Sequence, residues 1–338
     1  MEYSYINHWQ PLVSIVIPMY NEEKAIGRCL ESIINQDYPR DHLEIVVVDG
    51  KSNDASQSEV KKWMKQYSII RLLENPQKRT PLSLNIGIKN AAGEVIIILG
   101  AHTKIDPRFV SLNIHYMNIH QVKCTGGTQI NIGESFMQQA IGHAMGSGFG
   151  IPSAPYRYFR KPAFVDTVVY AAYHRDLFDQ IGFFNEKNHI AEDAELNWRV
   201  RKAGYKIFFT PEIISYYYPR KKIGRLAYQF FDYGISRVNV VKQHLNALKL
   251  IHLVPPFFVL ISIASLLLSA IHPPFIKIPG GLWGCYLIYL LAASIITSIQ
   301  IKTFRYCLIL PILFMAMQLS WGSGFLIGLF KTYKRNPL

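Results

Sequence analysis

The chain has 338 residues, which allows about two ordinary domains. Half of its residues are hydrophobic, only 17% are charged, and the formal net charge is +13. So basic a chain could bind nucleic acid, but no nucleic-acid-reading motif is present, and we exclude that class.

The N-terminal segment 1–10 (MEYSYINHWQ) is polar and has no apolar run. We therefore predict no signal peptide and a cytosolic N-terminal domain. The four cysteines show no CxxC spacing, which in a reducing compartment indicates packing residues rather than disulfides or a metal site. They are Cys29, Cys124, Cys285 and Cys307.

Continuous apolar runs alternate with helical patterns over the first hundred residues. Strands are predicted at 13–18, 43–48, 69–73 and 95–99, and helices at 22–35, 56–67 and 80–92. This alternation indicates a parallel sheet with right-handed crossovers, whose ligand lies beyond the carboxyl ends of the strands. No GxGxxG follows the first strand, which argues against a nicotinamide or flavin enzyme.

The next part of the chain is less regular. Segment 146–160 is rich in Gly, Pro, Tyr and Arg and is predicted to be a mobile loop, and no element is assigned from there to about residue 190. Residues 192–204 (EDAELNWRVRKAG) form a predicted helix, because acidic residues open it and a glycine closes it.

Three apolar stretches near the C-terminus are long enough to span a bilayer core, which takes roughly 20 helical residues. They lie at 251–271, 279–299 and 306–330. Buried helices of a soluble protein are the alternative, but these rarely stay uncharged over such lengths. Within the last stretch, Trp321-Gly322-Ser323-Gly324 predicts a helix break, so this segment either crosses the membrane or re-enters it.

Charge sets the expected orientation. Residues 201–249 hold ten Lys or Arg against Glu212 and Asp232, which favours the cytosolic side. The C-terminal end is also basic, with Lys331, Lys334 and Arg335, which favours the cytosolic side for it as well. Three crossings would instead put this end outside the cytosol. Of the two topologies we favour three crossings.

Residues 223–248 repeat apolar side chains at helical spacing with basic residues off the stripe, which predicts an amphipathic helix in the membrane interface. A soluble core helix is the alternative. The predicted division is a cytosolic domain at 1–218, interfacial helices at 219–249 and a membrane domain at 250–338.

Four segments, in this order, resemble glycosyltransferase family 2: VSIVIPMYNEE (13–23), EIVVVDGKSNDAS (44–56), LNIGIKNAAGEVIIILGAH (84–102) and AEDAELNWRVRKAGYKI (191–207). The chain looks most like the branch of succinoglycan-biosynthesis glucosyltransferases, with further matching segments at 165–186 and 218–237. The resemblance covers about residues 11–244. It implies an α/β GT-A fold with a Rossmann-like mixed sheet, a nucleotide-sugar donor, a divalent cation and inversion at the anomeric carbon.

The resemblance also implies donor-binding residues at the strand ends. The nucleotide is expected at Pro18, Tyr20, Asn21 and Glu22, its base at Asp49, its diphosphate at Lys78 and Arg79, and the donor also at Ala101. Purely structural roles remain open as alternatives: a strand-end cap for Asp49, a helix-start carboxylate for Glu22, and a solvated pair of charges for Lys78 and Arg79.

The metal position departs from the family pattern. Where most members end the fourth strand in Asp-x-Asp, this chain has Gly100-Ala101-His102. His102 falls at the metal-ligand position, and because imidazole tolerates Mn²⁺ better than Mg²⁺, we predict a preference for Mn²⁺. Weak metal dependence, or an inert strand-end histidine, is the alternative.

By the same resemblance, Asp193 is the general base, supported by Glu192 and Arg199. Helix capping is the alternative for the acids, and an ion pair with Glu195 is the alternative for Arg199.

A lipid-linked diphosphate is expected at Tyr218, Arg220 and Arg237, which could instead be interfacial anchors. Processive members carry Gln-x-x-Arg-Trp where this chain has Gln229-Phe230-Phe231-Asp232-Tyr233. One sugar per acceptor is therefore expected.

The predicted function is inverting transfer of one hexose from a nucleotide-diphosphate sugar, UDP favoured, to a polyprenyl-linked saccharide at the cytosolic face of the plasma membrane. One alternative is transfer to a polyprenyl monophosphate. A different class, a non-catalytic nucleotide-binding subunit of a polysaccharide complex, stays open because Gly100 lacks the usual carboxylate. The sequence leaves the oligomeric state open.

Overall fold

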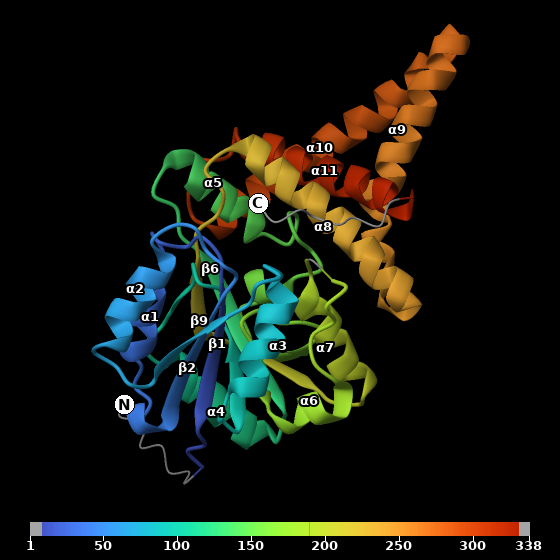
Figure 1. The fold of residues 1–338 in the computed structure, drawn as a ribbon. Helices are drawn as coiled ribbons and strands as arrows, with labels where there is room; N and C mark the ends of the chain where they lie inside the picture. Colours follow the sequence, from blue (N-terminus) through green and yellow to red (C-terminus); the bar gives the residue numbers. More distant parts are fainter. Residues whose placement is uncertain (1–8, 189, 331–338) are drawn as a thin grey trace. The chain divides into compact units, whose positions relative to one another are not determined.

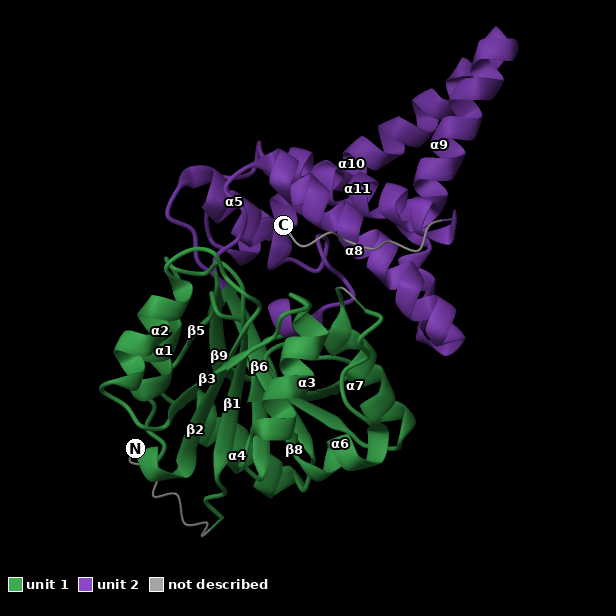
Figure 2. Ribbon diagram, in the orientation of Figure 1, with its two compact units in different colours: residues 1–130, 159–217, 336–338 green, residues 131–158, 218–335 purple. Residues whose placement is uncertain are grey.

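The computed structural model describes residues 9–188 and 190–330, in two compact units (Figure 2). Among the described residues, unit 1 holds the segment from Trp9 to Ile130 together with Phe159–Tyr217. Within the same described part, unit 2 holds Asn131–Tyr158 and the segment from Tyr218 to Phe330. The predictions made on residues 1–8 and on Lys331, Lys334 and Arg335 lie outside the described residues.

Unit 1 is built on one mixed sheet (Figure 1), whose order among the described residues is β3-β2-β1-β4-β8-β6-β9-β5, with β7 paired to β9. The first four strands in this order are parallel, as predicted, whereas β8 pairs antiparallel with β4 and β6, and β9 pairs antiparallel with β5 and β7. The strands are β1 (Val13–Met19), β2 (Leu43–Asp49), β3 (Ile70–Glu74), β4 (Val95–Ile98), β5 (Lys104–Ile105), β6 (Cys124–Asn131), β7 (Ala163–Val165), β8 (Ala172–His174) and β9 (Ile207–Tyr217).

Helices cover both faces of this sheet. Ile15 and Ile17 of β1 belong to the core formed with α1 and α4, whereas Val16 meets α3 at Gly87, where an added Cβ would lie 2.3 Å from Val16 Cγ1. Burial on both faces explains the uninterrupted apolar runs of the parallel strands. The helices are α1 (Ile26–Ile34), α2 (Ser56–Met64), α3 (Thr80–Asn90), α4 (Phe109–His120), α6 (Asp176–Ile181) and α7 (Glu192–Lys202), with the short η1 (Arg40–His42).

Two helix ends bear on the site. The predicted start of α1 at Glu22 is wrong: the helix begins at Ile26, because the Glu22 carbonyl already accepts the N–H groups of Ala25 and Ile26 in a preceding turn, at 2.9 Å each. Helix α7 begins at Glu192, as predicted, and ends at Lys202, two residues before the predicted closing residue Gly204, whose φ of +87° a side chain would resist.

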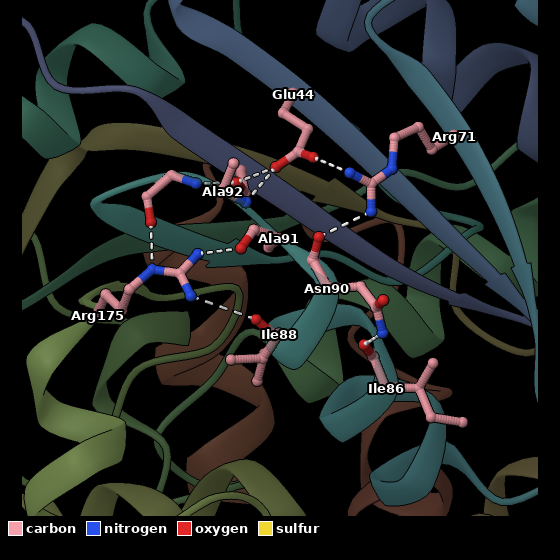
Figure 3. Close-up of polar contacts among 10 residues, drawn as sticks. Glu44, Arg71, Ile86, Ile88, Asn90, Ala91, Ala92 and Arg175 are labelled. Atoms are coloured by element: carbon pink, nitrogen blue, oxygen red, sulfur yellow. Dashed lines mark hydrogen bonds and ion pairs between the residues drawn. The ribbon is translucent and has the colours of Figure 1, made fainter.

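The C-terminal end of α3 is held by charged side chains at the amino ends of the strands (Figure 3). Arg175 donates from Nε to the Gly93 carbonyl at 2.6 Å and from Nη2 to the Ala91 carbonyl at 2.5 Å. These bonds satisfy carbonyl groups that a helix end leaves without partners.

Glu44 completes this network from β2. Its carboxylate accepts from Arg71 Nη1 at 2.9 Å and from the Ala92 N–H at 2.7 Å, and Arg71 also donates to the Asn90 carbonyl at 2.7 Å. The network therefore fixes one end of α3, whose other end carries the predicted diphosphate residues.

Arg175→Ala should lower the free energy of unfolding by about 2 kcal/mol, the scale of a hydrogen bond to a charged group. Chemical denaturation followed by tryptophan fluorescence measures the change. Arg108→Ala is the control, because the exposed side chain of this arginine makes, among the described residues, a single ion pair, with Asp106. Equal denaturation midpoints for the two variants would contradict the assigned role.

Unit 2 is helical in its described part. Its helices are α5 (Phe136–Met145), α8 (Ile223–Gln243), α9 (Val254–Ile271), α10 (Lys277–Gln300) and α11 (Leu310–Phe330), with the short η2 (Pro155–Arg157), η3 (Leu245–Ala247), η4 (Leu250–His252) and η5 (Pro273–Ile276). Within residues 9–188 and 190–330, three helical segments are long and apolar enough to cross a membrane: Leu250–Ile271, Pro273–Gln300 and Leu310–Phe330.

The side chains of α9 and α10 are arranged as a lipid environment favours. Small polar side chains such as Ser265 and Thr297 are buried, while large apolar ones such as Leu267 and Ile288 are more than 60% exposed. In lipid, small residues let helices approach and apolar ones face the acyl chains.

The predicted break at Trp321-Gly322-Ser323-Gly324 is wrong, because α11 is continuous through it. The glycines serve helix contact instead. A Cβ on Gly324 would lie 2.0 Å from the Phe231 carbonyl oxygen of α8, and one on Gly322 would lie 2.6 Å from the Pro255 carbonyl oxygen. Their role is to let neighbouring helices approach closely.

The amphipathic helix α8 ends at Gln243, five residues before the predicted end at Leu248. Four residues of its apolar stripe are buried: Leu226, Phe230, Ile235 and Val238. Glycine contacts place α8 directly against α11. At least part of the stripe therefore serves helix packing, and contact of this helix with a membrane interface stays a prediction.

Candidate active site

The carboxyl end of β2 carries a buried acid, Asp49. Its carboxylate accepts the Ser52 N–H at 3.0 Å, the Ser52 hydroxyl at 2.6 Å and the Gln57 side-chain amide at 2.6 Å. A carboxylate so supplied with donors is a fixed acceptor at the strand end. These hydrogen bonds fix the loop after β2, so Asp49 acts as a strand-end cap. Its contact with a nucleotide base stays a prediction.

Hydrogen bonds join the loops after β1 and β2. The Asn21 N–H donates to Ser52 Oγ at 2.9 Å, and Asn21 Oδ1 accepts the Asn53 N–H at 3.0 Å. The Glu22 N–H donates to Ser56 Oγ at 2.7 Å. The predicted nucleotide residues Asn21, Glu22 and Asp49 therefore belong to one hydrogen-bonded edge of unit 1, beside Pro18 at the end of β1.

The loop after β3 folds around Asn75, which is fully buried. The Asn75 side chain donates to the Arg79 carbonyl at 3.0 Å and to Ser83 Oγ at 2.9 Å. The Lys78 N–H donates to the Asn75 carbonyl at 3.3 Å, and the Lys78 ammonium lies 5.3 Å from the centre of the Tyr20 ring. Arg79 donates to the Glu186 carbonyl, and its contact with a diphosphate stays a prediction.

His102 lies in the turn after β4 and contacts Glu22. Its Nδ1 is 2.9 Å from Glu22 Oε1, and its ring meets the edge of Tyr217 with centroids 6.0 Å apart. Ala101 is buried beneath this turn. The structure thus joins the predicted metal residue to a predicted nucleotide residue 80 positions away.

Backbone strain gathers at the same edge. Asn21, Lys51 and Lys78, which follow β1, β2 and β3, have φ of 54°, 64° and 55°. Tyr170, whose hydroxyl lies 3.6 Å from where a Gly100 Cβ would be, has a φ of 52°. Such left-handed non-glycine residues cost energy and tend to cluster at functional sites.

The first turn of α7 holds the predicted base. Ala191, just before it, has a φ of 65°, and Glu192 and Asp193 follow as the first two helical residues. Burial, and after it the Asp193 carboxylate, raise the pKa of Glu192 to about 7. A proton on Glu192 would relieve the repulsion between the two carboxyl groups, and the role of Asp193 as the base stays a prediction.

Arg199 pairs with Glu195, as one sequence alternative held. Its Nε and Nη2 lie 2.8 Å and 2.9 Å from the two carboxylate oxygens, and it donates to the carbonyl groups of Gly182 and Phe183. This geometry braces the segment before α7. A further part for Arg199 in the reaction stays a prediction.

The remaining predicted residues lie in unit 2. Tyr218, Arg220 and Arg237 belong to it, and their contact with a lipid diphosphate stays a prediction. Several residues in the unit 1 site were not predicted: Ser52, Ser56, Gln57, Tyr170 and Tyr217. Of these, Ser52 could have been found, because a serine three residues after a strand-end aspartate is typical of a turn closed by that carboxylate.

Few protein groups are available to hold a metal. Among the described residues, no three His, Cys, Asp or Glu side chains gather as a metal cage. Hard divalent cations at phosphate sites take one or two protein ligands and complete their shell with phosphate oxygens and water. A role of this kind for His102, beside a diphosphate, stays a prediction.

Comparisons with known proteins agree with this architecture. The model of Glycosyl transferase family 2 matches residues 14–182. A dolichyl N-acetyl-alpha-D-glucosaminyl phosphate 3-beta-D-2,3-diacetamido-2,3-dideoxy-beta-D-glucuronosyltransferase of Methanococcus voltae is 31% identical over 327 residues, 94% of this chain and 97% of its own length. Succinoglycan biosynthesis protein ExoA of Rhizobium meliloti is 25% identical over 321 residues, 92% and 93% of the two chains.

The fold is also found in solved structures. Mannosyltransferase PcManGT from Pyrobaculum calidifontis, in complex with GDP-Man and Mn²⁺, matches with a TM-score of 0.63 at 20% identity, over 90% of this chain and 87% of that chain. This likeness confirms the predicted GT-A-like mixed sheet followed by C-terminal helices. With the family model spanning half of the chain and a relative 31% identical over nearly its whole length, the chain belongs to glycosyl transferase family 2 and is a glycosyltransferase.

Proposed function

We propose that this enzyme transfers one hexose from a nucleotide-diphosphate sugar to a lipid-linked saccharide, with inversion at the anomeric carbon and with UDP as the favoured nucleotide. One observation carries the proposal: Asn21, Asp49 and His102 come from three different strand ends and lie on one edge of the sheet in unit 1. In open α/β sheets the ligand binds at this edge.

The chain's own residues account for donor binding and proton transfer. The fixed acceptor at Asp49 would hold the base, with Pro18, Tyr20, Asn21 and Ala101 lining the nucleotide. Lys78 and Arg79 would neutralise the diphosphate. Asp193 would take the proton of the acceptor hydroxyl while the hydroxyl oxygen bonds to the anomeric carbon. The bond between that carbon and the diphosphate breaks at the same time, and its electron pair leaves with the diphosphate.

A divalent cation, Mn²⁺ in preference to Mg²⁺, fits beside His102 and would stabilise the departing diphosphate. The donor set supports this choice, since imidazole suits transition metals and Gly100 supplies no carboxylate. The solved mannosyltransferase of the same fold was obtained with GDP-Man and Mn²⁺.

The acceptor side rests on the relatives and on unit 2. The Methanococcus relative is named for transfer to a dolichyl-phosphate sugar and for a β linkage, which inversion of an α-linked donor produces. Three helices able to cross a membrane would keep such an acceptor close. We place the catalytic part, about 1–218, on the cytosolic face of the plasma membrane, with 219–249 at the interface, 250–338 within the bilayer, and Tyr218, Arg220 and Arg237 near the lipid phosphate.

An acceptor competition tests this assignment. The detergent-purified chain receives Mn²⁺ and radiolabelled UDP- or GDP-hexoses, together with polyprenyl-linked N-acetylglucosamine and bare polyprenyl monophosphate. Label on the saccharide-bearing lipid, in a β linkage by NMR coupling constants, is expected. Label on polyprenyl monophosphate alone would instead establish a polyprenyl-phosphate sugar synthase.

Gly100→Asp should increase the rate supported by Mg²⁺ relative to that supported by Mn²⁺. An added Cβ there lies 3.7 Å from His102 Cε1 and 3.2 Å from Thr103 Oγ1, so a carboxylate fits beside the imidazole after a small shift. Initial rates with each metal measure the ratio. Gly100→Asn, of equal size and without charge, is the control, and an equal rise in both variants would contradict the carboxylate's role.

A further inference from the structure

His102 and Glu22 form a pair whose chemistry goes beyond nucleotide contact. A carboxylate oxygen only accepts hydrogen bonds, so His102 Nδ1, 2.9 Å from Glu22 Oε1, must carry the shared proton. In a neutral imidazole this leaves Nε2 with the free lone pair. Within residues 9–188 and 190–330, Nε2 has no hydrogen-bond partner.

The pair is built to hold this orientation. The Glu22 N–H is held by Ser56, and its carbonyl accepts two N–H groups at the start of α1, so the backbone that carries the carboxylate is fixed on both sides. The Glu22 side chain is 26% exposed and that of His102 is 45% exposed. The carboxylate is thus partly sheltered, while the ring stays open to a ligand.

The absence of a side chain at residue 100 gives the pair its importance. A carboxylate there would lie beside the imidazole and could bind a cation directly. Glycine removes that ligand, and the nearby carboxylate of Glu22 comes from the loop after β1 and reaches the ring nitrogen instead. In metal sites such a carboxylate orients the histidine and makes it a better ligand.

We propose that Glu22 is a positioning residue for the divalent cation: it fixes His102 in the tautomer whose Nε2 is available to the metal. This inference rests on the proposed metal-supported function. The task of Glu22 is then distinct from contact with the nucleotide, and its carboxylate compensates for the metal-binding carboxylate that is missing at Gly100.

A double-mutant cycle on cation binding tests the proposal without measuring turnover. The full chain in detergent is titrated with Mn²⁺ in the presence of UDP or GDP, and free Mn²⁺ is followed by electron paramagnetic resonance. Glu22→Ala should weaken Mn²⁺ binding about 10- to 100-fold, the range seen when such a supporting partner is removed, and His102→Ala, which removes the ligand itself, should weaken it at least as much. The double variant should bind no more weakly than His102→Ala, because Glu22 acts only through the ring.

Two further variants separate positioning from other causes. Glu22→Gln keeps an oxygen acceptor for Nδ1–H and should retain most of the affinity. Glu23→Ala is the matched control, since the Glu23 carboxylate accepts the Ala55 N–H at 3.1 Å and, within the described part of the chain, forms no hydrogen bond or ion pair with His102. Its Mn²⁺ binding should equal that of the wild type. Thermal melting confirms that each variant is folded.

Two kinds of result would overturn the proposal. If Glu22→Ala weakens Mn²⁺ binding as much in the His102→Ala background as in the wild type, or weakens metal-free nucleotide binding by the same factor, Glu22 contacts the ligands directly and the proposal is wrong. If the wild type itself takes up no Mn²⁺ beyond that bound by free nucleotide, the proposed metal site fails, whatever Glu22 does.

Discussion

Asp193→Asn should lower the kcat of sugar transfer by about 10²- to 10⁴-fold, the usual contribution of a general base. Asparagine keeps the size of the side chain but cannot accept the acceptor's proton. Donor binding should change little, because the nucleotide is held by other strand ends. Steady-state rates with a radiolabelled donor, and a separate titration with the nucleoside diphosphate, measure the two quantities.

The control for this variant is Asp179→Asn, an exposed acid of α6 in the same unit. It should transfer sugar at the wild-type rate. Full activity of Asp193→Asn would refute its role as base. An equal loss of donor affinity and kcat would show a damaged site rather than a missing base.

Gly324→Leu should destabilise unit 2 severely, by more than the about 1–3 kcal/mol typical of overpacking. Its Cβ would lie 2.0 Å from the Phe231 carbonyl oxygen, so the backbones of α8 and α11 would have to separate. The loss is expected as a large fall in melting temperature and in the yield of folded protein from detergent.

Gly284→Leu is the matched control on α10. An added Cβ there meets nothing within 4 Å, so the same change in size should leave melting nearly unchanged. Two variants of equal stability would contradict the close α8–α11 contact.

The predictable part of the fold was the part that local pattern encodes. The runs at β1, β2 and β4 are apolar throughout because both faces of those strands are buried, and each is found where predicted. Helix α4 was missed, since its sequence FVSLNIHYMNIH mixes apolar residues with Asn and His on every face. Its buried Asn113 is satisfied by Thr125 of β6 at 2.8 Å, a partner that the helix's own sequence does not reveal.

Features that depend on contacts between distant parts of the chain could not be predicted from the sequence. Gly322 and Gly324 suggest a helix break when α11 is considered alone, yet they permit contact with α8 and with Pro255. Similarly, strand-end position identified Glu22 and His102 separately, but their contact joins residues 80 positions apart and depends on β1 and β4 being neighbours. Both the continuity of α11 and the Glu22–His102 contact therefore depend on tertiary packing, which local sequence does not reveal.

Release of nucleoside diphosphate tests the central claim, sugar transfer at this edge of the sheet, most directly. The purified chain and its Asp193→Asn variant receive Mn²⁺, a panel of UDP- and GDP-hexoses and a polyprenyl-linked saccharide. We predict acceptor-dependent release from at least one donor with the wild type, falling at least about 100-fold in the variant. No release from any donor by the folded wild-type chain, or equal release by both proteins, would contradict it.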